Sequence, residues 1–485
     1  MKEKKSEAPR RGNEELFKWD GNPTFGQILP LAAQHVLAAV VGCVTPAILV
    51  ANAANNAGGN VNMGLLIQMS LVFAALSTFL QLYVNKIHLG SGLPVIIGVS
   101  FAYVPTMTAI AAQAQDVNTI FGAMIVGGIV AIIVGLTIKQ IRKVFPPLVI
   151  GTVIFAIGLS LYKTAINYMA GNSANTYEVI VEQRGQTAAL VYGSWQNWLV
   201  AFLTLAVVTG LNHFGRGILK LASILIGIIV GYVVSIPFGM VSLSSVGQAK
   251  MFQLPQFMHF GIHFEISACV AIGLLFAINS VQAIGDYSAT TIGAMDREPE
   301  DRELQNGITA YGVTNIIGAL LGGLPTATYS QNVGIVTTTK VINRWVLGLA
   351  AVILGVAGIV PKFSALLTTI PQCVLGGATV SVFASIAMTG MKVVASEEMD
   401  YRNSSIVGLA AAIGVGVSQA SAALASFPGW VTTIFGKSPV VLATLIAVIL
   451  NIILPKSSDE KKHEAKLRKR VKERIRKDHE EFEQH

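Results

Sequence analysis

TATYSQNVGIVTTTK, residues 326–340, is the segment that decides how the rest of the sequence is interpreted. It places uncharged hydrogen-bonding side chains and a glycine, Gly334, within an otherwise apolar part of the chain. Polar, β-branched backbone at membrane depth is tolerated only where protein or a water-filled cavity satisfies its hydrogen bonds. The segment therefore predicts the lining of a substrate site.

The composition of the whole chain indicates a polytopic membrane protein. Of 485 residues, 53% are hydrophobic and only 12% are charged, which is too little charge to cover a soluble protein. The net charge of +8 is concentrated at Lys2–Lys18 and Lys456–Lys477, a pattern that favours cytoplasmic flanks over nucleic-acid binding. The N-terminal region lacks an apolar core before a small-residue cleavage site, so we expect the first spanning helix to direct insertion.

Fourteen apolar windows are long enough to cross a hydrocarbon core about 30 Å thick. They cover approximately residues 27–50, 63–84, 93–112, 118–138, 145–162, 195–212, 217–240, 266–290, 305–322, 327–342, 343–360, 370–391, 405–425 and 439–455. An even number places both termini on one side. The loops then assigned to the cytoplasm hold twelve Lys and Arg residues against five outside, which is the expected bias.

These windows predict a plasma-membrane protein with both termini in the cytoplasm. A transporter domain of residues 25–455 would lie between an N-terminal tail, residues 1–24, and a basic C-terminal tail, residues 456–485. Apolar residues recur at helical spacing in the C-terminal tail, which is typical of an amphipathic helix on anionic lipid. A solvated, partly disordered tail explains the same composition equally well.

An internal duplication is indicated by two correspondences between the halves of the chain. Proline and glycine interrupt the third and tenth windows (Pro94, Gly98, Pro105, Pro325, Gly334), so each is expected to be part extended and part helical. The motif P-x-x-V-[IL]-G opens the fifth window at residues 146–151 and the twelfth at 371–376. Two halves of seven spans have opposite membrane orientation, so the fold expected is an all-α, 7+7 inverted repeat.

Two ionisable residues lie inside predicted spans, where an ionisable group requires a partner or a function. His35, in the first window, is either a structural hydrogen-bonding residue or a proton carrier. Asp286, in the eighth, is a candidate functional carboxylate, although holding backbone amides of the tenth window would equally explain it. Gln282 lies one helical turn before Asp286, so both share a face that we expect to meet residues 326–340.

The amides of Gln282 and Gln331 each present one acceptor and two donor hydrogens, which suits a planar ligand with alternating N–H and C=O groups. Phe101 is a candidate stacking surface for such a ligand, or an ordinary packing residue. The sequence contains no catalytic motif, so an enzyme is not predicted. The three cysteines lie in apolar runs without metal-ligand spacing, and the charged segment at residues 296–303 reads as a solvated turn, so neither a cofactor nor a metal is expected.

The segment from Gln331 to Lys340 resembles the signature [QE]-N-x-G-x-x-x-x-T-[RK] of the nucleobase/ascorbate transporter family. Four further motifs are similar to that family and stand in the same order: residues 34–35, 98–102, 284–287 and 450–455. The resemblance covers residues 25–455. It implies a core domain of helices 1–4 and 8–11, about residues 25–140 and 263–360, and a gate domain of helices 5–7 and 12–14, about residues 145–240 and 362–455.

Members of the family usually form homodimers and move by an elevator-like mechanism. Gln331 and the Gly285-Asp286 pair resemble the purine branch, whereas uracil permeases typically carry Glu and His in place of Gln331 and Asp286. The resemblance implies substrate contacts at Gln331, Gln282, Ser330, Ser100 and Phe101. It implies supporting or coupling roles for Asp286, His35, Asn332, Gly334, Thr339 and Tyr311.

The chain departs from the family at two usually acidic positions, occupied here by Gln282 and Tyr311. An amide keeps its hydrogen bonds but does not exchange a proton near neutral pH, which puts the usual route of proton symport in doubt. The leading hypothesis is a plasma-membrane permease for xanthine or urate, coupled to protons through Asp286 or His35.

Three other hypotheses remain. In these hypotheses the protein is an uncoupled facilitator, a carrier of uracil or another nucleobase coupled to another ion such as sodium, or a transport-inactive purine sensor. Transport of sulfate or bicarbonate is disfavoured because no Lys or Arg lies in the middle of a window.

Overall fold

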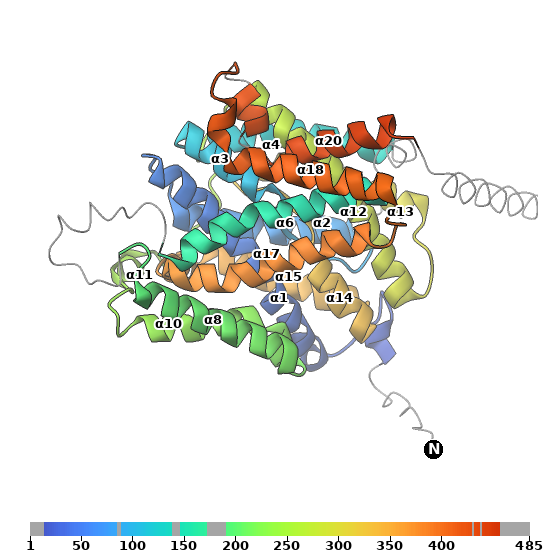
Figure 1. The fold of residues 1–485 in the computed structure, drawn as a ribbon. Coiled ribbons are helices and arrows are strands. Elements are labelled where there is room, and N and C mark those ends of the chain that lie inside the picture. The colour runs from blue at the N-terminus through green and yellow to red at the C-terminus, as the bar shows by residue number, and fades with distance from the viewer. Residues whose placement is uncertain are drawn as a thin grey trace, which may run out of the picture.

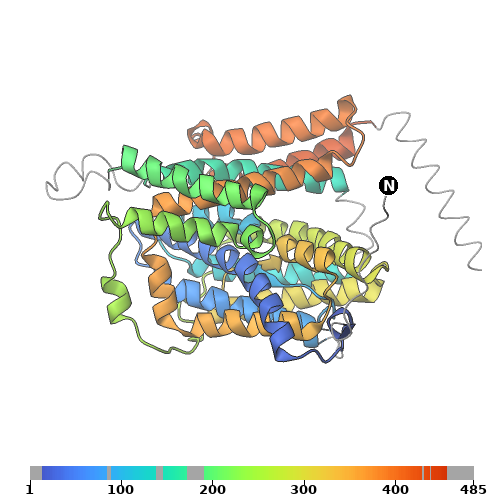
Figure 2. The same cartoon turned by 90° about the horizontal axis from the view of Figure 1, so that it is seen from below.

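The computed structural model describes residues 14–84, 89–137, 146–171, 191–428, 431–436 and 439–455. The expected C-terminal tail, residues 456–485, and the first thirteen residues of the N-terminal tail lie outside the described residues. The described chain is predominantly helical (Figures 1 and 2). Its two short strands pair as one sheet.

Elements from both halves of the sequence form a first bundle. It comprises α1 (Phe25–Asn56), α2 (Met63–Tyr83), β1 (Ile97–Val99), the 3-10 turn η3 (Phe101–Tyr103), α3 (Val104–Ala114), α4 (Asn118–Leu136), α12 (Ile266–Met295), α13 (Asp301–Leu321), β2 (Thr326–Thr328), α14 (Ser330–Thr339), α15 (Arg344–Ile359) and α16 (Pro361–Thr368). In this bundle α4 packs on α12 and α13, while α15 packs on α1 and α2. The two sets of contacts correspond to each other across the two halves of the sequence.

A second bundle contains α6 (Pro147–Met169), α8 (Trp195–Phe214), α10 (Ser223–Ser235), α17 (Gln372–Val394), α18 (Tyr401–Gln419) and α20 (Pro439–Ile453). In Figure 1, α6 and α17 lie in the middle, with α8 and α10 on one side and α18 and α20 on the other. Shorter elements are η1 (Glu14–Phe17), α9 (Ile218–Leu221), α11 (Ser244–Gln248), η5 (Ser421–Leu424) and a π-helical turn, η6 (Thr432–Gly436).

The two helices that begin with P-x-x-V-[IL]-G pack against each other over their whole length. Both are 23 residues long, and each has the proline of the motif at its N-cap. A Cβ added to Gly151, near the start of α6, would lie 2.8 Å from the nitrogen of Val394 at the end of α17. One added to Gly376, near the start of α17, would lie 2.2 Å from the nitrogen of Met169 at the end of α6. The glycine near the start of each helix thus lets the end of the other helix approach closely, so the two helices contact each other in the same way.

Among the described residues, seven helices are long and apolar enough to cross a membrane, or eight if the bent pair α15–α16 counts as one. Each of the fourteen predicted windows overlaps at least one helix, but α3, α10, α14, α15 and α20 are only 10–16 residues long, so the structure supports fewer spans than the windows predicted. The chain bends by 77° between α15 and α16 because Pro361, at the first position of α16, disfavours a helical conformation at Val360. The bend places α16 against α2.

The charged segment at residues 296–303 forms the turn before α13 and the first residues of that helix. Arg297 donates to both carboxylate oxygens of Glu303, at 2.8 and 2.5 Å, and this hydrogen bonding raises the pKa of Arg297. The Glu303 carboxylate also accepts from the backbone nitrogen of Glu300 at 2.9 Å, which satisfies a free N–H at the helix start.

The N-terminal segment before α1 is folded onto the loop that precedes α15. The buried amide of Asn343 donates to the backbone oxygens of Glu15, Lys18 and Gly21 at 2.9–3.1 Å. Arg344 forms an ion pair with Asp20 at 3.0 Å. Residues 14–24 are therefore part of the first bundle, although the sequence suggested that they belong to a tail.

Candidate functional site

The site is organised by the antiparallel pairing of β1 with β2, which brings together residues about 230 positions apart. Ile97, Gly98 and Val99 pair with Thr328, Ala327 and Thr326, respectively. Beyond the strands, Ser100 donates its backbone N–H to Pro325 and Tyr329 donates to Ile96, both at 3.0 Å. This pairing satisfies the backbone of both segments inside the protein, as buried extended chain requires.

Tyr329 fixes how closely the strands approach α1. Its hydroxyl donates to the backbone oxygen of Val99 at 2.7 Å and lies 3.5 Å from the sulfur of Cys43. The ring covers Gly98, where an added Cβ would lie only 2.5 Å from a Tyr329 ring carbon. Glycine is therefore required at position 98 by this close contact.

Asp286 of α12 is linked to residues 326–340 through two hydroxyl groups. Its Oδ1 accepts from Ser330 at 2.8 Å and its Oδ2 accepts from Thr328. The carboxyl is buried, so these hydrogen bonds replace hydration. The predicted meeting of the Gln282–Asp286 face with residues 326–340 is therefore present. The contact is made through side-chain hydroxyls, whereas the sequence suggested backbone amides.

His35 and Asn332 form the second connection to α14. The Asn332 amide donates to His35 Nδ1 at 3.0 Å and to the His35 backbone oxygen at 3.1 Å. The Asn332 amide therefore holds His35 both by its ring and by its backbone. Asn332 is fully buried, and its side-chain oxygen has no hydrogen-bond partner among the described residues.

A cavity of about 500 Å³ lies where the two bundles meet, beside Asp286. The first bundle contributes Gln282, Asp286 and Ser330, and the second contributes residues of α6 and α17, including Ile150 and Thr389. Gly285 also lines this cavity and is exposed, and nothing lies within 4 Å of the position that a Cβ would take. The space beside Gly285 is therefore open. The size of the cavity and its few polar groups on an apolar wall are typical of a small-molecule site.

Gln331 lines a different cavity. This second space, of about 210 Å³, also includes Lys220 of α9 and Ser381 and Ser385 of α17. Ser330 and Gln331 are consecutive residues in the first turn of α14, so their side chains point about 100° apart. The structure therefore does not place the amides of Gln331 and Gln282 in one cavity, although the sequence suggested a shared site.

Hydroxyl residues of α17 line both cavities, Ser381 and Ser385 the smaller one and Thr389 the larger, and they were not identified from the sequence. Ser381, Ser385 and Thr389 are spaced four residues apart and therefore lie on one helix face. The hydroxyls of Ser385 and Thr389 donate to backbone oxygens one turn earlier, at 2.9 and 2.8 Å, which leaves their lone pairs free to accept. The i, i+4, i+8 spacing of hydroxyls was the available signal.

The other predicted residues are placed as follows. Phe101 packs edge-on against Phe383 of α17, with ring centroids 5.6 Å apart, and lines neither cavity. Ser100 caps η3 by accepting from the backbone nitrogen of Ala102 at 3.3 Å. Tyr311 contacts the hydroxyl of Tyr103 and stacks on Phe276, away from both cavities.

The remaining two signature residues lie along α14. Gly334 is exposed, and an added Cβ would meet nothing within 4 Å. Thr339 accepts from the Val341 nitrogen at 3.3 Å beside Lys340, whose φ is +58°, so it stabilises the end of the helix. Among the described residues, no group of three metal-ligating side chains occurs.

Comparison with known proteins identifies relatives over most of the chain. The model of a family described as "Permease family" matches residues 26–423. A xanthine permease of Escherichia coli, XanQ, is 30% identical over 93% of this chain and 96% of its own length. A uric acid permease of Bacillus subtilis, PucJ, is 32% identical over 88% of this chain and 92% of its own.

Solved structures show that the fold is shared with more distant transporters. The transmembrane domain of a cyanobacterial bicarbonate transporter, BicA, aligns over 87% of this chain and 97% of that domain, with a TM-score of 0.53 and 16% identity. A murine anion transporter, solute carrier 26 family member A9, covers 93% of this chain with a TM-score of 0.53. The family match confirms the resemblance inferred from the motifs, and the chain belongs to this permease family as a multi-pass membrane transporter rather than an enzyme.

Proposed function

We propose that this permease carries a purine nucleobase, xanthine or urate, across the plasma membrane, and that the substrate binds in the 500 Å³ cavity beside Asp286. The observation that carries the proposal is the convergence of Gln282, Asp286 and Ser330 on one wall of that cavity, between the two bundles. Relatives of similar length include xanthine and uric acid permeases, which supports the substrate class.

The roles proposed for these residues follow from their hydrogen-bonding capacity. No hydrogen bond occupies the amide of Gln282 among those found in the described structure, so its donors and acceptor are available to the N–H and C=O groups of a purine. Asp286 already accepts from Thr328 and Ser330, so it positions α14 against α12 instead of contacting the substrate directly. Thr389 supplies an acceptor from the opposite bundle.

Gln331 is proposed as a second substrate contact, in the smaller cavity. Lys220 lines the same space, and its ammonium would attract urate, which is an anion near neutral pH. The α17 hydroxyls then offer a polar surface between the two cavities along which the substrate moves.

The proposed transport mechanism is an elevator-type movement of the first bundle against the second, in a homodimer with both termini cytoplasmic. Fourteen spans arranged as a 7+7 inverted repeat are supported by the exchangeable contacts of Gly151 and Gly376 and by the corresponding positions of β1–α3 and β2–α14. In this arrangement the first bundle is the core domain and the second is the gate domain.

Coupling to protons is proposed to act through Asp286 or His35. Protonation of Asp286 would convert one carboxylate oxygen from an acceptor into a donor, so one of its two hydroxyl partners would have to reorient. Protonation of His35 at Nδ1 would break the hydrogen bond from Asn332. Either change would loosen the attachment of α14 to the first bundle.

Uptake measurements test the proposed substrate. The protein, expressed in a strain that lacks its own purine permeases, is expected to accumulate labelled xanthine or urate and to be inhibited by unlabelled purines more than by uracil. Expression at the membrane without uptake of either purine would refute the proposal.

An uncoupled facilitator is the second candidate, because Gln282 and Tyr311 are uncharged at usually acidic positions. A protonophore separates the two candidates. It should abolish accumulation against a gradient in a proton-coupled permease, whereas a facilitator only equilibrates its substrate and shows no accumulation.

A further inference from the structure

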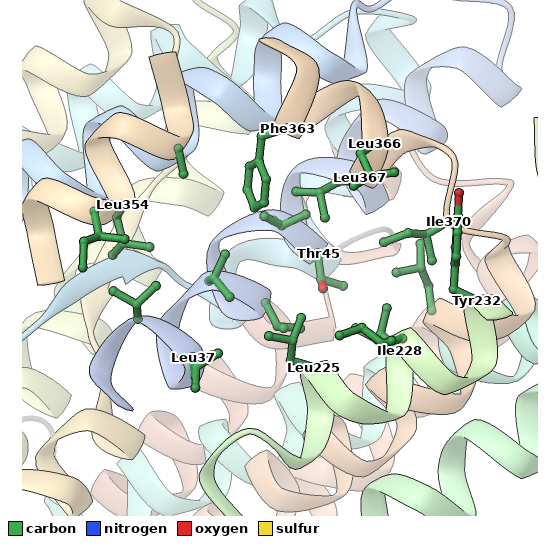
Figure 3. Close-up of a pocket in the computed structure, with 18 residues that line it drawn as sticks. Leu37, Thr45, Leu225, Ile228, Tyr232, Leu354, Phe363, Leu366, Leu367 and Ile370 are labelled. Atoms are coloured by element: carbon green, nitrogen blue, oxygen red, sulfur yellow. The ribbon is translucent and has the colours of Figure 1, made fainter. Parts of the chain in front are cut away.

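A third cavity, of about 450 Å³, lies on the opposite side of α1 from the strands and is almost entirely apolar. Figure 3 shows that Phe363, Leu366 and Leu367 of α16 surround it from one side and Leu225 and Ile228 of α10 from the other, with Thr45 of α1 between them. Its walls therefore come from both bundles.

The chemistry of the walls excludes a purine as the occupant. Thr45 and Tyr232 provide the only side-chain hydroxyls in the lining, and the Tyr232 hydroxyl is already hydrogen bonded to Thr369 at 2.8 Å. The N–H and C=O groups of a nucleobase would lose their hydration there without replacement, which is unfavourable. Water is disfavoured for the same reason, because apolar cavities without polar partners stay dry.

Lipid has access to the cavity. Ile229 and Leu366, which line it, are 52% and 42% exposed, and Val352, Val356 and Val233 on the neighbouring helices are exposed as well. In a multi-pass membrane protein, exposed apolar side chains of this kind contact acyl chains. The volume matches one such chain: a methylene is about as large as a water molecule, about 30 Å³ in the liquid, so on the order of fifteen fit.

A positive charge lies on the same face of α16 as the rim of the cavity. Lys362 is exposed and precedes Leu366 by four residues, so the two side chains are neighbours on the helix surface. Among the described residues, no carboxylate forms an ion pair with Lys362. An anionic headgroup would place its phosphate near this ammonium while one acyl chain enters the cavity.

We propose that this cavity binds one acyl chain of an anionic phospholipid, with the headgroup at Lys362, as a lipid site between the two bundles. The site is separate from the cavities proposed for the substrate. Because α10 lies on one side of the cavity and α1, α15 and α16 lie on the other, the bound acyl chain packs between the two bundles.

Lipid retention by the purified full-length protein tests the assignment. After delipidation in detergent, the protein is titrated with phosphatidylglycerol or with phosphatidylcholine of the same acyl chains, and bound lipid is counted by native mass spectrometry. We expect one phosphatidylglycerol per chain to bind at least tenfold more tightly than phosphatidylcholine. Equal affinity for the two lipids in the unmodified protein would overturn the proposal.

Two matched tryptophan variants on α15 locate the site. Ala357 lines the cavity, so Ala357→Trp should fill it and abolish retention of the lipid. Val356 is 51% exposed beside it but does not line the cavity, so Val356→Trp should retain the lipid. Lys362→Gln should remove the preference for phosphatidylglycerol. Equal retention in both tryptophan variants, or an unchanged preference in Lys362→Gln, would contradict the assignment.

A fluorescence measurement avoids the need to fill the cavity. In detergent, and in a protein whose five native tryptophans are replaced by phenylalanine, Leu366→Trp at the rim should be quenched by one equivalent of phosphatidylglycerol with brominated acyl chains, whereas Val356→Trp should not. Equal quenching of both variants, or of neither, would show that the lipid does not occupy this cavity.

Discussion

Among single residues, Gly98 and Gly334 separate two reasons for a glycine in a transporter site. Gly98 lies under the ring of Tyr329, where a Cβ would approach to 2.5 Å. Gly334 lies within α14 and has open space around it. The first is explained by packing, whereas the second has no steric explanation in this structure.

Alanine substitutions at both glycines test this difference. Gly98→Ala should destabilise the protein by about 1–3 kcal/mol because Tyr329 must move. Gly334→Ala should leave stability unchanged or raise it by up to about 1 kcal/mol, since alanine favours a helix interior. Thermal unfolding in detergent measures both changes. A loss of transport in Gly334→Ala without a loss of stability would assign that glycine to movement or substrate passage.

Gln282 and Gln331 are proposed to contact the substrate in two separate cavities, and alanine substitutions test each contact. Gln282→Ala removes the amide from the proposed site, and losing one or two hydrogen bonds of about 0.5–1.5 kcal/mol each should raise the KM for the purine roughly tenfold. Gln331→Ala should raise it as well if the substrate visits the second cavity. Uptake kinetics of both variants, normalised to surface expression, make the comparison. An unchanged KM in Gln282→Ala would show that the substrate does not bind in the cavity beside Asp286.

Gln282→Glu introduces an ionisable group where an amide is present. A carboxylate facing the same cavity as Asp286 should make uptake depend more steeply on pH, because two acidic groups then compete for protons. The pH profile of initial uptake rates is the readout. An unchanged profile would show that this position does not govern coupling.

Among the helices, α17 carries Ser381, Ser385 and Thr389 on one face, and substitutions there test whether these hydroxyls contact the substrate. Ser385→Ala and Thr389→Val should each raise the KM by roughly three- to tenfold, as expected for one lost acceptor, and leave the unfolding temperature unchanged. Ser418→Ala on α18 is the matched control, since that hydroxyl also bonds to its own helix but lines neither substrate cavity. Equal effects in all three variants would indicate a general helix effect.

The sequence predicted the elements better than their relative rotations. Every apolar window overlaps an observed helix, and the extended parts of the third and tenth windows were predicted from proline, glycine and β-branched residues. The eleventh window ends at residue 360, immediately before Pro361, but the helix α16 that follows was missed because eight residues that include Lys362 are too short and too polar for a spanning window. The separation of Gln331 from Gln282 depends on how α14 faces α17, and periodicity within one helix does not determine that contact.

For the whole molecule, the proposed movement predicts that the bundles slide past one another. Phe101 and Phe383 touch across their boundary, with centroids 5.6 Å apart. In a protein whose native cysteines are replaced, Phe101→Cys with Phe383→Cys should permit a cross-link that stops uptake reversibly. Trp195 and Phe238, 5.9 Å apart on α8 and just after α10, provide the matched pair within one bundle. Uptake that survives the first cross-link would refute sliding at this boundary.

The attachment of residues 14–24 to the loop before α15 has a consequence for biosynthesis. Asn343 is separated by 322 residues from Gly21, whose backbone oxygen it binds. At about 5–20 residues per second, the ribosome needs on the order of 15–60 s to connect the two. During that interval the first helix is inserted while its N-terminal segment lacks its final partner. Chaperones and proteases on that side of the membrane would therefore meet residues 14–24 as an exposed peptide until the second half of the chain is made.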